Sequence, residues 1–322
     1  MRKSVLTTGL AATALLAFAA TASAQNVKVT PLGSHDGELC AFDRAMLFED
    51  PDGTVVLYDT GRTVAGTDDA RVGKVDVLLV SHMHGDHVGD RHIPAVNAGE
   101  CGKPDVSVVD APNTGTVNMA IAKGATIVTG SEMPAFFAAK LKSLGGDAAK
   151  SVLVRFGASR KIGGVTITTV PANHSNGISP AFIGGSLGDM MNAVGLQGYA
   201  GPPTGYVLHF SNGLVAYLSG DTGVVSEQKT VVADQYGAEL VVINIGDMFT
   251  TGPKEAAYVV NELIKPATVI PSHANEPATQ GGKVRDGSKT ATFLGLVKAA
   301  AHVPLSGKTM EFDGEGKCVG GC

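Results

Sequence analysis

The sequence contains no tryptophan, and aromatic residues make up only 5% of its 322 positions, whereas glycine occurs 42 times. A chain this rich in glycine is expected to contain many tight turns and loops. Basic residues are also few: 25 lysines and arginines stand against 30 acidic residues, without clusters, for a formal net charge of −5. A mildly acidic protein without basic patches is a poor candidate for binding nucleic acid or an anionic membrane.

Long apolar runs are absent beyond the N-terminus. There, a basic head and an apolar stretch precede the small residues Ala22-Ser23-Ala24. This pattern is typical of a secretory signal peptide, and a retained membrane anchor is disfavoured because the run is short and lacks a stop-transfer pattern. The sequence therefore predicts a signal peptide over residues 1–24 and one mature domain over residues 25–322. The mature protein is expected in the periplasm or outside the cell, without membrane contact.

Cysteine is scarce, with four residues: Cys40, Cys101, Cys318 and Cys322. An even number in a secreted chain favours two disulfides, for which three connectivities exist. The preferred pairing is Cys40–Cys101 with Cys318–Cys322. A structural zinc site on the four cysteines is the alternative, and it is disfavoured because their spacings include no C-x2-C pair.

Short β-branched runs alternate with alanine-rich or amphipathic segments along the mature chain, which indicates an α/β class with layered sheets. Residues 175–204 differ: they are rich in glycine, proline and methionine, and they predict a long loop that either covers an active site or forms a passive surface insertion. Strands are expected over 27–31, 45–49, 54–59, 75–81, 165–170, 205–210, 214–218, 239–245 and 267–270, and helices over 134–144 and 253–264.

The stretch SHMHGDHVGD, residues 81–90, holds three of the nine histidines within six positions, directly after a continuous apolar run. Loops at the carboxyl ends of strands are where α/β sheets present their chemistry. Imidazole and carboxylate are ligands that suit zinc and other divalent transition metals. His82 and His84 form one ligand pair, and Asp86 and His87 form a second, so the stretch can begin two neighbouring metal sites. Gly85 between the pairs allows the sharp backbone that such crowding needs.

The sequence His-Met-His-Gly-Asp-His at 82–87 resembles the H-x-H-x-D-H signature of the metallo-β-lactamase superfamily. Four further motifs of that superfamily occur in the expected order, so the resemblance extends from about residue 27 to residue 275. They are Tyr-Asp-Thr-Gly at 58–61, Val-Pro-Ala-Asn-His at 170–174, Leu-Ser-Gly-Asp-Thr-Gly at 218–223 and Val-Ile-Pro-Ser-His at 269–273.

The resemblance implies a four-layer αβ/βα sandwich, with two pseudo-symmetric halves and two divalent metal ions at one edge between the sheets. Zinc is the first expectation for these ions, and manganese or iron are the alternatives. A supporting, non-ligating role for Asp59 is also implied, because carboxylates commonly orient metal-bound histidines. The implied ligands are His82, His84 and His174 for the first ion, Asp86, His87 and His273 for the second, and Asp221 as the bridge between them.

Two metal ions can bridge a hydroxide that attacks a carbonyl or phosphoryl centre without a serine or cysteine nucleophile. Asp86 and Asp221 are the predicted catalytic residues: Asp221 bridges the ions, and Asp86 orients the hydroxide or relays a proton. β-Lactamases of the superfamily typically carry cysteine or serine where this chain has Asp221, which argues against a dedicated β-lactamase. His84 stands where the diiron oxygen-reducing branch has glutamate.

Residues 246–257, with Gly-Asp-Met-Phe-Thr-Thr-Gly-Pro and a later Ala-Ala, resemble a stretch of bacterial metal-dependent hydrolases related to ascorbate-6-phosphate lactonase. The sequence therefore predicts a secreted or periplasmic dinuclear hydrolase that opens a lactone or related ester of a small molecule. The alternatives are a phosphodiesterase, which would be expected to place a lysine or arginine near the metals, a β-lactamase-like activity, an iron-dependent oxidoreductase and a non-catalytic binding protein. Asn275 and Glu276, which follow His273, are candidates for substrate contact.

Overall fold

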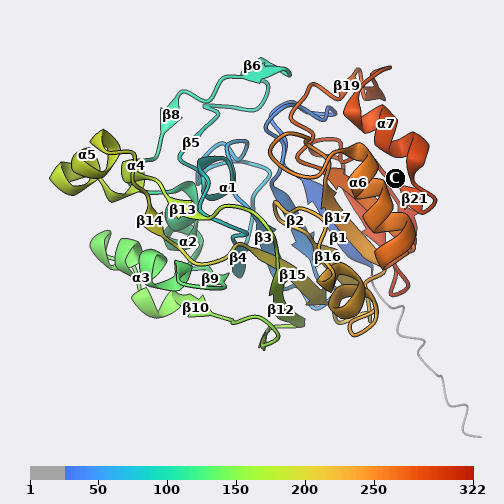
Figure 1. Ribbon diagram of the computed structural model, residues 1–322, viewed down its shortest axis with the longest axis horizontal. Coiled ribbons are helices and arrows are strands. Elements are labelled where there is room, and N and C mark those ends of the chain that lie inside the picture. Colours follow the sequence, from blue (N-terminus) through green and yellow to red (C-terminus); the bar gives the residue numbers. More distant parts are fainter. Residues whose placement is uncertain (1–25) are drawn as a thin grey trace, which may run out of the picture.

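The structure is a computed structural model that describes residues 26–322. The predicted signal peptide lies outside the described residues. Two mixed β-sheets face each other at the centre of the molecule, and helices cover their outer faces (Figure 1). The first sheet has the order β10 (Ser151–Leu153), β9 (Thr126–Thr129), β4 (Val77–Leu79), β3 (Val55–Tyr58), β2 (Met46–Glu49), β1 (Val27–Pro31), β22 (Met310–Phe312) and β23 (Cys318–Gly320).

The second sheet repeats the plan of the first. In both, consecutive antiparallel strands are followed by parallel strands, with β3, β4, β9 and β10 parallel in the first sheet and β16, β17, β18 and β21 parallel in the second. The two halves predicted from the sequence thus share one architecture. The order of the second sheet is β11 (Ser159–Ile162), β12 (Val165–Pro171), β15 (Thr204–His209), β16 (Val215–Leu218), β17 (Leu240–Asn244), β18 (Thr268–Ser272) and β21 (Ala300–Ala301).

Helices α2 (Gly115–Lys123) and α3 (Met133–Ser143) cover the first sheet, whereas α6 (Pro253–Tyr258), its π-helical continuation η3 (Val259–Ile264) and α7 (Lys289–Leu296) cover the second (Figure 1). The remaining short elements lie in the connections between these layers. They are α1 (Gly85–Val88), β5 (Arg91–His92), β6 (Gly99–Glu100), β7 (Lys103–Pro104), β8 (Val108–Val109), η1 (Ala148–Lys150), β13 (Gly177–Ile178), α4 (Pro180–Ile183), α5 (Gly185–Ala193), β14 (Gly198–Tyr199), η2 (Gln228–Ala233), β19 (Thr279–Gln280) and β20 (Lys283–Val284).

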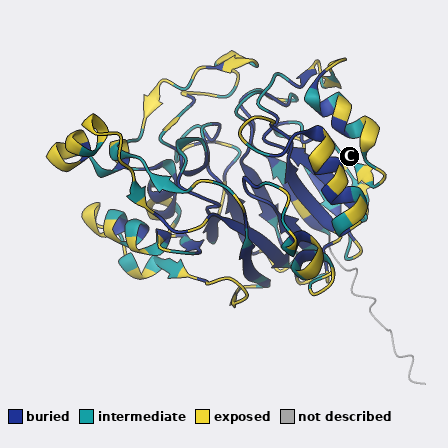
Figure 2. Cartoon of the chain, viewed as in Figure 1, coloured by how far each residue is buried: buried dark blue, intermediate teal, exposed yellow. Residues whose placement is uncertain are grey.

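Three apolar cores separate the four layers. The central core lies between the sheets and includes Phe48 and Leu79 from the first sheet and Tyr206 and Leu218 from the second. The other two cores lie between each sheet and its helices. The central strands of both sheets are therefore buried on both faces, whereas the helices have buried and exposed faces (Figure 2). This burial explains why β3 and β4 read as continuous apolar runs in the sequence. The predicted four-layer αβ/βα sandwich is confirmed.

Each strand and helix expected from the sequence has a counterpart, but the prediction of a structureless loop over residues 175–204 is wrong. That segment forms β13, α4, α5 and β14, and Ser179 caps α4 with Pro180 in its first turn. Leu187 and Met190 on α5 are exposed, so the helix has no buried apolar stripe by which its periodicity could be recognised. Among residues 26–322 no helix has the length and apolar character needed to cross a membrane.

Both cysteine pairings expected from the sequence are present in the structure, as disulfides Cys40–Cys101 and Cys318–Cys322. The first joins the segment before β2 to the β6–β7 hairpin, and the second closes the C-terminal strand. With all four sulfur atoms paired, no thiolate is left for the alternative four-cysteine zinc site.

Candidate metal centre

The histidine-rich loop begins two residues after β4 ends and turns directly into α1. Gly85, the first residue of α1, packs against Asp90, and a Cβ atom there would lie 2.5 Å from Asp90 Cγ. Arg62 fixes Asp90 through two hydrogen bonds, from Nε at 2.7 Å and Nη2 at 2.8 Å. No side chain can therefore be accommodated at position 85, and this constraint shapes the loop that presents the candidate ligands.

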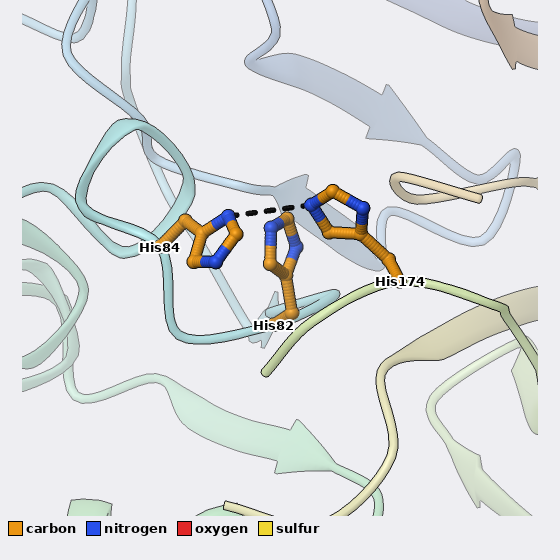
Figure 3. A group of neighbouring side chains, drawn as sticks. All are labelled: His82, His84 and His174. Atoms are coloured by element: carbon orange, nitrogen blue, oxygen red, sulfur yellow. Dashed lines mark hydrogen bonds between the residues drawn. The ribbon is translucent and has the colours of Figure 1, made fainter. Parts of the chain in front are cut away.

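His82, His84 and His174 converge from two different sheets, and we call them the three-histidine group (Figure 3). His174 follows β12 of the second sheet, while the other two follow β4 of the first. One ring nitrogen from each of the three lies within 4.8 Å of the others, and Nε2 of His174 is 3.4 Å from Nδ1 of His84. This spacing places three imidazole donors around one point.

Asp86, His87 and His273 form a second group with the same mutual spacing, which we call the Asp86 group. Asp221, directly beyond β16, lies between the two groups. Its Oδ2 atom is 3.0 Å from His273 Nε2 and 3.3 Å from His87 Nε2. The same oxygen is 3.7 Å from His174 Nε2 and 3.8 Å from His82 Nε2. The structure thus brings all seven residues predicted as ligands together, with one carboxylate shared by both groups.

Asp59 orients the rings from behind. Its Oδ2 accepts hydrogen bonds from His87 Nδ1 and from Ser81 Oγ, both at 2.8 Å, and its Oδ1 accepts one from the backbone N–H of Ser81. Because Ser81 donates to Asp59, its oxygen accepts from His82 Nδ1 at 2.9 Å. Asp59 holds a positive φ of 43°, a conformation that costs about 1–3 kcal/mol and recurs at functional sites. The Nδ1 protons of both histidines are thereby directed away from the centre.

The donor set fits divalent metal ions. With their Nδ1 atoms engaged, His82 and His87 direct Nε2 inward, and both Nε2 atoms are buried without a hydrogen-bond partner. A buried nitrogen lone pair without a partner is unfavourable unless it binds a proton donor or a cation. Imidazole and carboxylate donors are the ligands that zinc and other divalent transition metals prefer.

Burial lowers the pKa of every ring in the three-histidine group, most strongly for His82. These rings are neutral at neutral pH and available as ligands. His87 behaves differently: burial lowers its pKa, but the carboxylates of Asp221, Asp59 and Asp86 outweigh that effect and raise it to about 10. A cation that binds the Asp86 group must therefore displace a proton from His87, so binding there releases a proton.

Arg44 also belongs to this centre, although nothing in the sequence motifs singled it out. Its guanidinium is only 4% exposed, and Nη2 lies 2.8 Å from Asp86 Oδ2 and 2.7 Å from Asn275 Oδ1. Burial raises the pKa of Asp86, but Arg44 and His87 together hold it well below its usual range. The sequence offers one signal for Arg44: it is a charged residue two positions before an apolar strand. A charged side chain that is buried there must be paired with an opposite charge or a hydrogen-bond acceptor.

A cavity of about 310 Å³ opens onto the metal centre. Arg44 and Arg62 line it together with Phe42 and Phe249, and Phe249 is 65% exposed. Of the two candidate substrate contacts, Asn275 lines the cavity, but Glu276 does not. Its carboxylate instead accepts hydrogen bonds from the first backbone N–H groups of α7. The 175–204 segment contributes Ser175 to the cavity, whereas α4 and α5 do not line it.

The sequence profile of the Beta-lactamase superfamily domain matches residues 54–274, which include all seven predicted ligands. The chain belongs to this superfamily. A UPF0173 metal-dependent hydrolase of Cupriavidus metallidurans is 31% identical over 252 residues, which cover 75% of this chain and 71% of that protein. Another such hydrolase, from Polynucleobacter asymbioticus, is 30% identical over an alignment of 332 residues, and this alignment covers 97% of this chain and 99% of that protein.

Solved structures show the same fold. The metallo hydrolase Igni18 of Ignicoccus hospitalis superposes with a TM-score of 0.58 at 20% identity, over 89% of this chain and 99% of that one. The metallo-β-lactamase fold protein YhfI of Bacillus subtilis gives a TM-score of 0.54 at 14% identity, over 89% of this chain and 99% of its own. The resemblance stated from the motifs is thus confirmed, and family and fold together identify a metal-dependent hydrolase.

Proposed function

We propose that this protein is a periplasmic or secreted dinuclear hydrolase that opens a lactone or a related ester. The observation that supports it is Asp221, whose Oδ2 atom faces histidines of both ligand groups within 3.8 Å. A single carboxylate oxygen shared by two ligand sets is suited to bridging two ions. The secreted location is supported by the two disulfides, which persist in oxidising compartments.

In this proposal the three-histidine group would hold one ion, the Asp86 group would hold the other, and Asp221 would be shared between the two ligand sets. Zinc is proposed because nitrogen donors dominate the set. When bound, a pair of divalent ions supplies a hydroxide at neutral pH and polarises the substrate oxygen. Asp86 is 22% exposed and faces the cavity, so its carboxylate can accept a hydrogen bond from the attacking water and orient it.

The cavity residues position the substrate. Phe42 and Phe249 provide aromatic surface at the mouth, and Asn275 is held by Arg44 with its side chain at the cavity wall. Asn275 and His273 both have positive φ values, 52° and 51°, so the backbone after β18 is bent toward the centre. An ester of modest size fits a cavity of this volume, which is at the lower end of those that bind small molecules.

A second candidate reaction is phosphodiester hydrolysis, and a specific observation favours it. The sequence motifs fixed no basic residue near the ligands, but the structure places both Arg44 and Arg62 in the cavity wall. Guanidinium groups suit phosphate oxygens through charge-assisted hydrogen bonds. Arg44 and Arg62 are already paired with Asp86 and Asp90, which leaves fewer donors for a substrate phosphate and ranks this reaction second.

The test is acid release in a pH-stat with mature protein loaded with zinc or manganese. The panel contains a lactone, a simple ester, a β-lactam and a phosphodiester, each with and without chelator. Chelator-sensitive acid release from the lactone or ester supports the proposal. Acid release from the phosphodiester alone supports the second candidate, phosphodiester hydrolysis, in its place. No acid release from any substrate by protein that holds two ions would contradict both hydrolytic assignments and favour a binding protein.

A further inference from the structure

A second cavity, of about 610 Å³, is larger than the cavity that opens onto the metal centre. None of the seven predicted ligands lines it, and it shares no lining residue with the cavity at the metal centre. Its walls come from the 60–68 loop, the paired strands β5 and β8 with the residue after β8, the helix α2 and Leu144, so we call it the α2 cavity. Its volume is within the range of cavities that bind small organic molecules.

The polar part of the α2 cavity consists of Asp110, His92 and Asn118. The Asp110 side chain is 8% exposed, and its Oδ1 accepts a hydrogen bond from Asn118 Nδ2 at 2.7 Å. Its second oxygen, Oδ2, is buried and has no hydrogen-bond partner. A buried carboxylate oxygen without a donor is costly, by about 1–3 kcal/mol or more. Such an oxygen is therefore a strong acceptor site for a ligand.

His92 adds a second acceptor opposite the first. Its Nδ1 lies 2.8 Å from the backbone carbonyl of Ile93 and must donate to it, because a carbonyl oxygen can only accept. In the neutral ring Nε2 is then an acceptor, and it lies 3.9 Å from Asp110 Oδ2, beyond hydrogen-bond distance. Two acceptors at this separation match one ligand group that carries at least two N–H donors.

The rest of the wall sets the charge and the apolar character of the ligand. Asp68 adds a second carboxylate at the rim, and none of the residues that line the α2 cavity is a lysine or arginine. Val64, Ala65 and Met119 form an apolar wall. At the edge, Ile121 is 40% exposed and Leu144 is 50% exposed. An acidic, half-apolar cavity favours an organic cation with an apolar part.

We propose that the α2 cavity binds a primary alkyl- or arylalkylammonium ion. The ammonium group has three donors and no acceptor, so it can bond Asp110 Oδ2 and His92 Nε2 together while its apolar chain lies against Met119 and Ile121. The site does not depend on metal or on the proposed hydrolysis. It does share a wall with the metal centre, because the backbone N–H of Gly61 in its lining donates to the carbonyl of His87 at 2.9 Å.

The proposal is tested by isothermal titration calorimetry on chelator-treated protein with two probes, n-hexylammonium and 2-phenylethylammonium. Hexanoate and 1-hexanol are the ligand controls, with the same chain but the opposite or no charge. Asp110→Asn keeps the shape and removes the charge, and it is expected to weaken ammonium binding tenfold or more. The matched control is Asp189→Asn on the exposed face of α5, which is expected to leave the affinity unchanged.

A second variant, Ala122→Trp, fills the α2 cavity from its lining and is expected to abolish binding of both ammonium ions while circular dichroism remains that of the parent. If Asp110→Asn fails to fold, this variant decides the question. The proposal is overturned if neither ammonium ion binds at 10 mM, if hexanoate or hexanol binds as tightly, or if binding persists in Ala122→Trp.

Discussion

Replacing Arg44 with methionine is expected to destabilise the metal-free protein much more than the metal-loaded protein. The guanidinium is 4% exposed, and it is bonded to Asp86 and Asn275. Removing one partner of a buried ion pair costs about 3–5 kcal/mol, because the other charge remains buried without compensation. Asp86 is 22% exposed, so water recovers part of this cost and the expected loss in the free energy of unfolding is about 2–3 kcal/mol.

A metal ion on Asp86 would supply the positive charge that the variant lacks. The loss in the loaded protein is then limited to the hydrogen bond with Asn275 and to packing, about 1 kcal/mol. The assay is urea unfolding at pH 7, with chelator and with saturating zinc. The direction of this change also follows from the pKa of Asp86. Burial raises that pKa, but Arg44 and His87 hold it below its usual range. The ionised Asp86 therefore stabilises the folded protein above about pH 4, and this stabilisation is lost as the pH falls through the pKa of the folded state.

Arg71→Met is the matched control for this experiment. Arg71 also forms two side-chain hydrogen bonds with a carboxylate, but its partner Asp69 is not a predicted ligand, and neither residue lines the cavity at the metal centre. Its loss of stability should therefore be the same with and without zinc. An equal loss for Arg44→Met in both conditions, or a loss below about 0.5 kcal/mol without metal, would refute the reasoning that Arg44 compensates the largely buried charge of Asp86.

Three further predictions address the centre and the frame that holds it. Asp221→Ala is expected to lower the bound metal to one ion or fewer per chain and to abolish turnover; two ions with full activity would rule out the shared carboxylate. Because burial lowers the pKa of every ring in the three-histidine group, these rings stay unprotonated below the ordinary histidine value of about 6.5. One ion per chain should therefore remain after dialysis from pH 7.5 down to about 6, whereas an ion at the Asp86 group competes with the proton of His87. Loss of the last ion above pH 6.5 would contradict the lowered pKa values. Replacing Cys40 and Cys101 with serine opens a disulfide that spans 61 positions and should lower the free energy of unfolding by up to about 4 kcal/mol, measured in urea; an unchanged midpoint would show that the bond is energetically silent.

The candidate ligands could be named from the sequence because each stands in a short motif of contiguous residues, four of them in one stretch and three through the resemblance. Each motif follows a strand, and the strand is recognisable as an apolar run that ends in polar residues, as at Leu79 and the histidines beyond it. Both sheets then place these ends at one edge. Arg44 could not be predicted in this way, because its partners Asp86 and Asn275 lie far along the chain and only the folded structure brings them together.

For the same reason, the α2 cavity could not be predicted from the sequence. His92 belongs to no motif, and its significance arises only because β5 pairs with β8, the strand just before Asp110. Asn118, the third polar residue, lies on α2. Nothing in the spacing of these residues distinguishes them from surface positions, and their isolation from solvent is a tertiary property. Chemistry built from contiguous residues can thus be recognised in a sequence, whereas chemistry built from paired segments needs the fold.

Assembly of the metal centre is coupled to packing of the two sheets. The first sheet supplies the histidine-rich loop, and the second supplies His174, Asp221 and His273. The central core sets the relative position of the two sheets. Within it, the hydroxyl of Tyr206 from the second sheet donates a 2.7 Å hydrogen bond to the carbonyl of Val80, two residues before His82. Neither half can form either ligand group with the shared Asp221 by itself. Metal binding and docking of the two halves must therefore stabilise each other, because each fixes the geometry that the other requires.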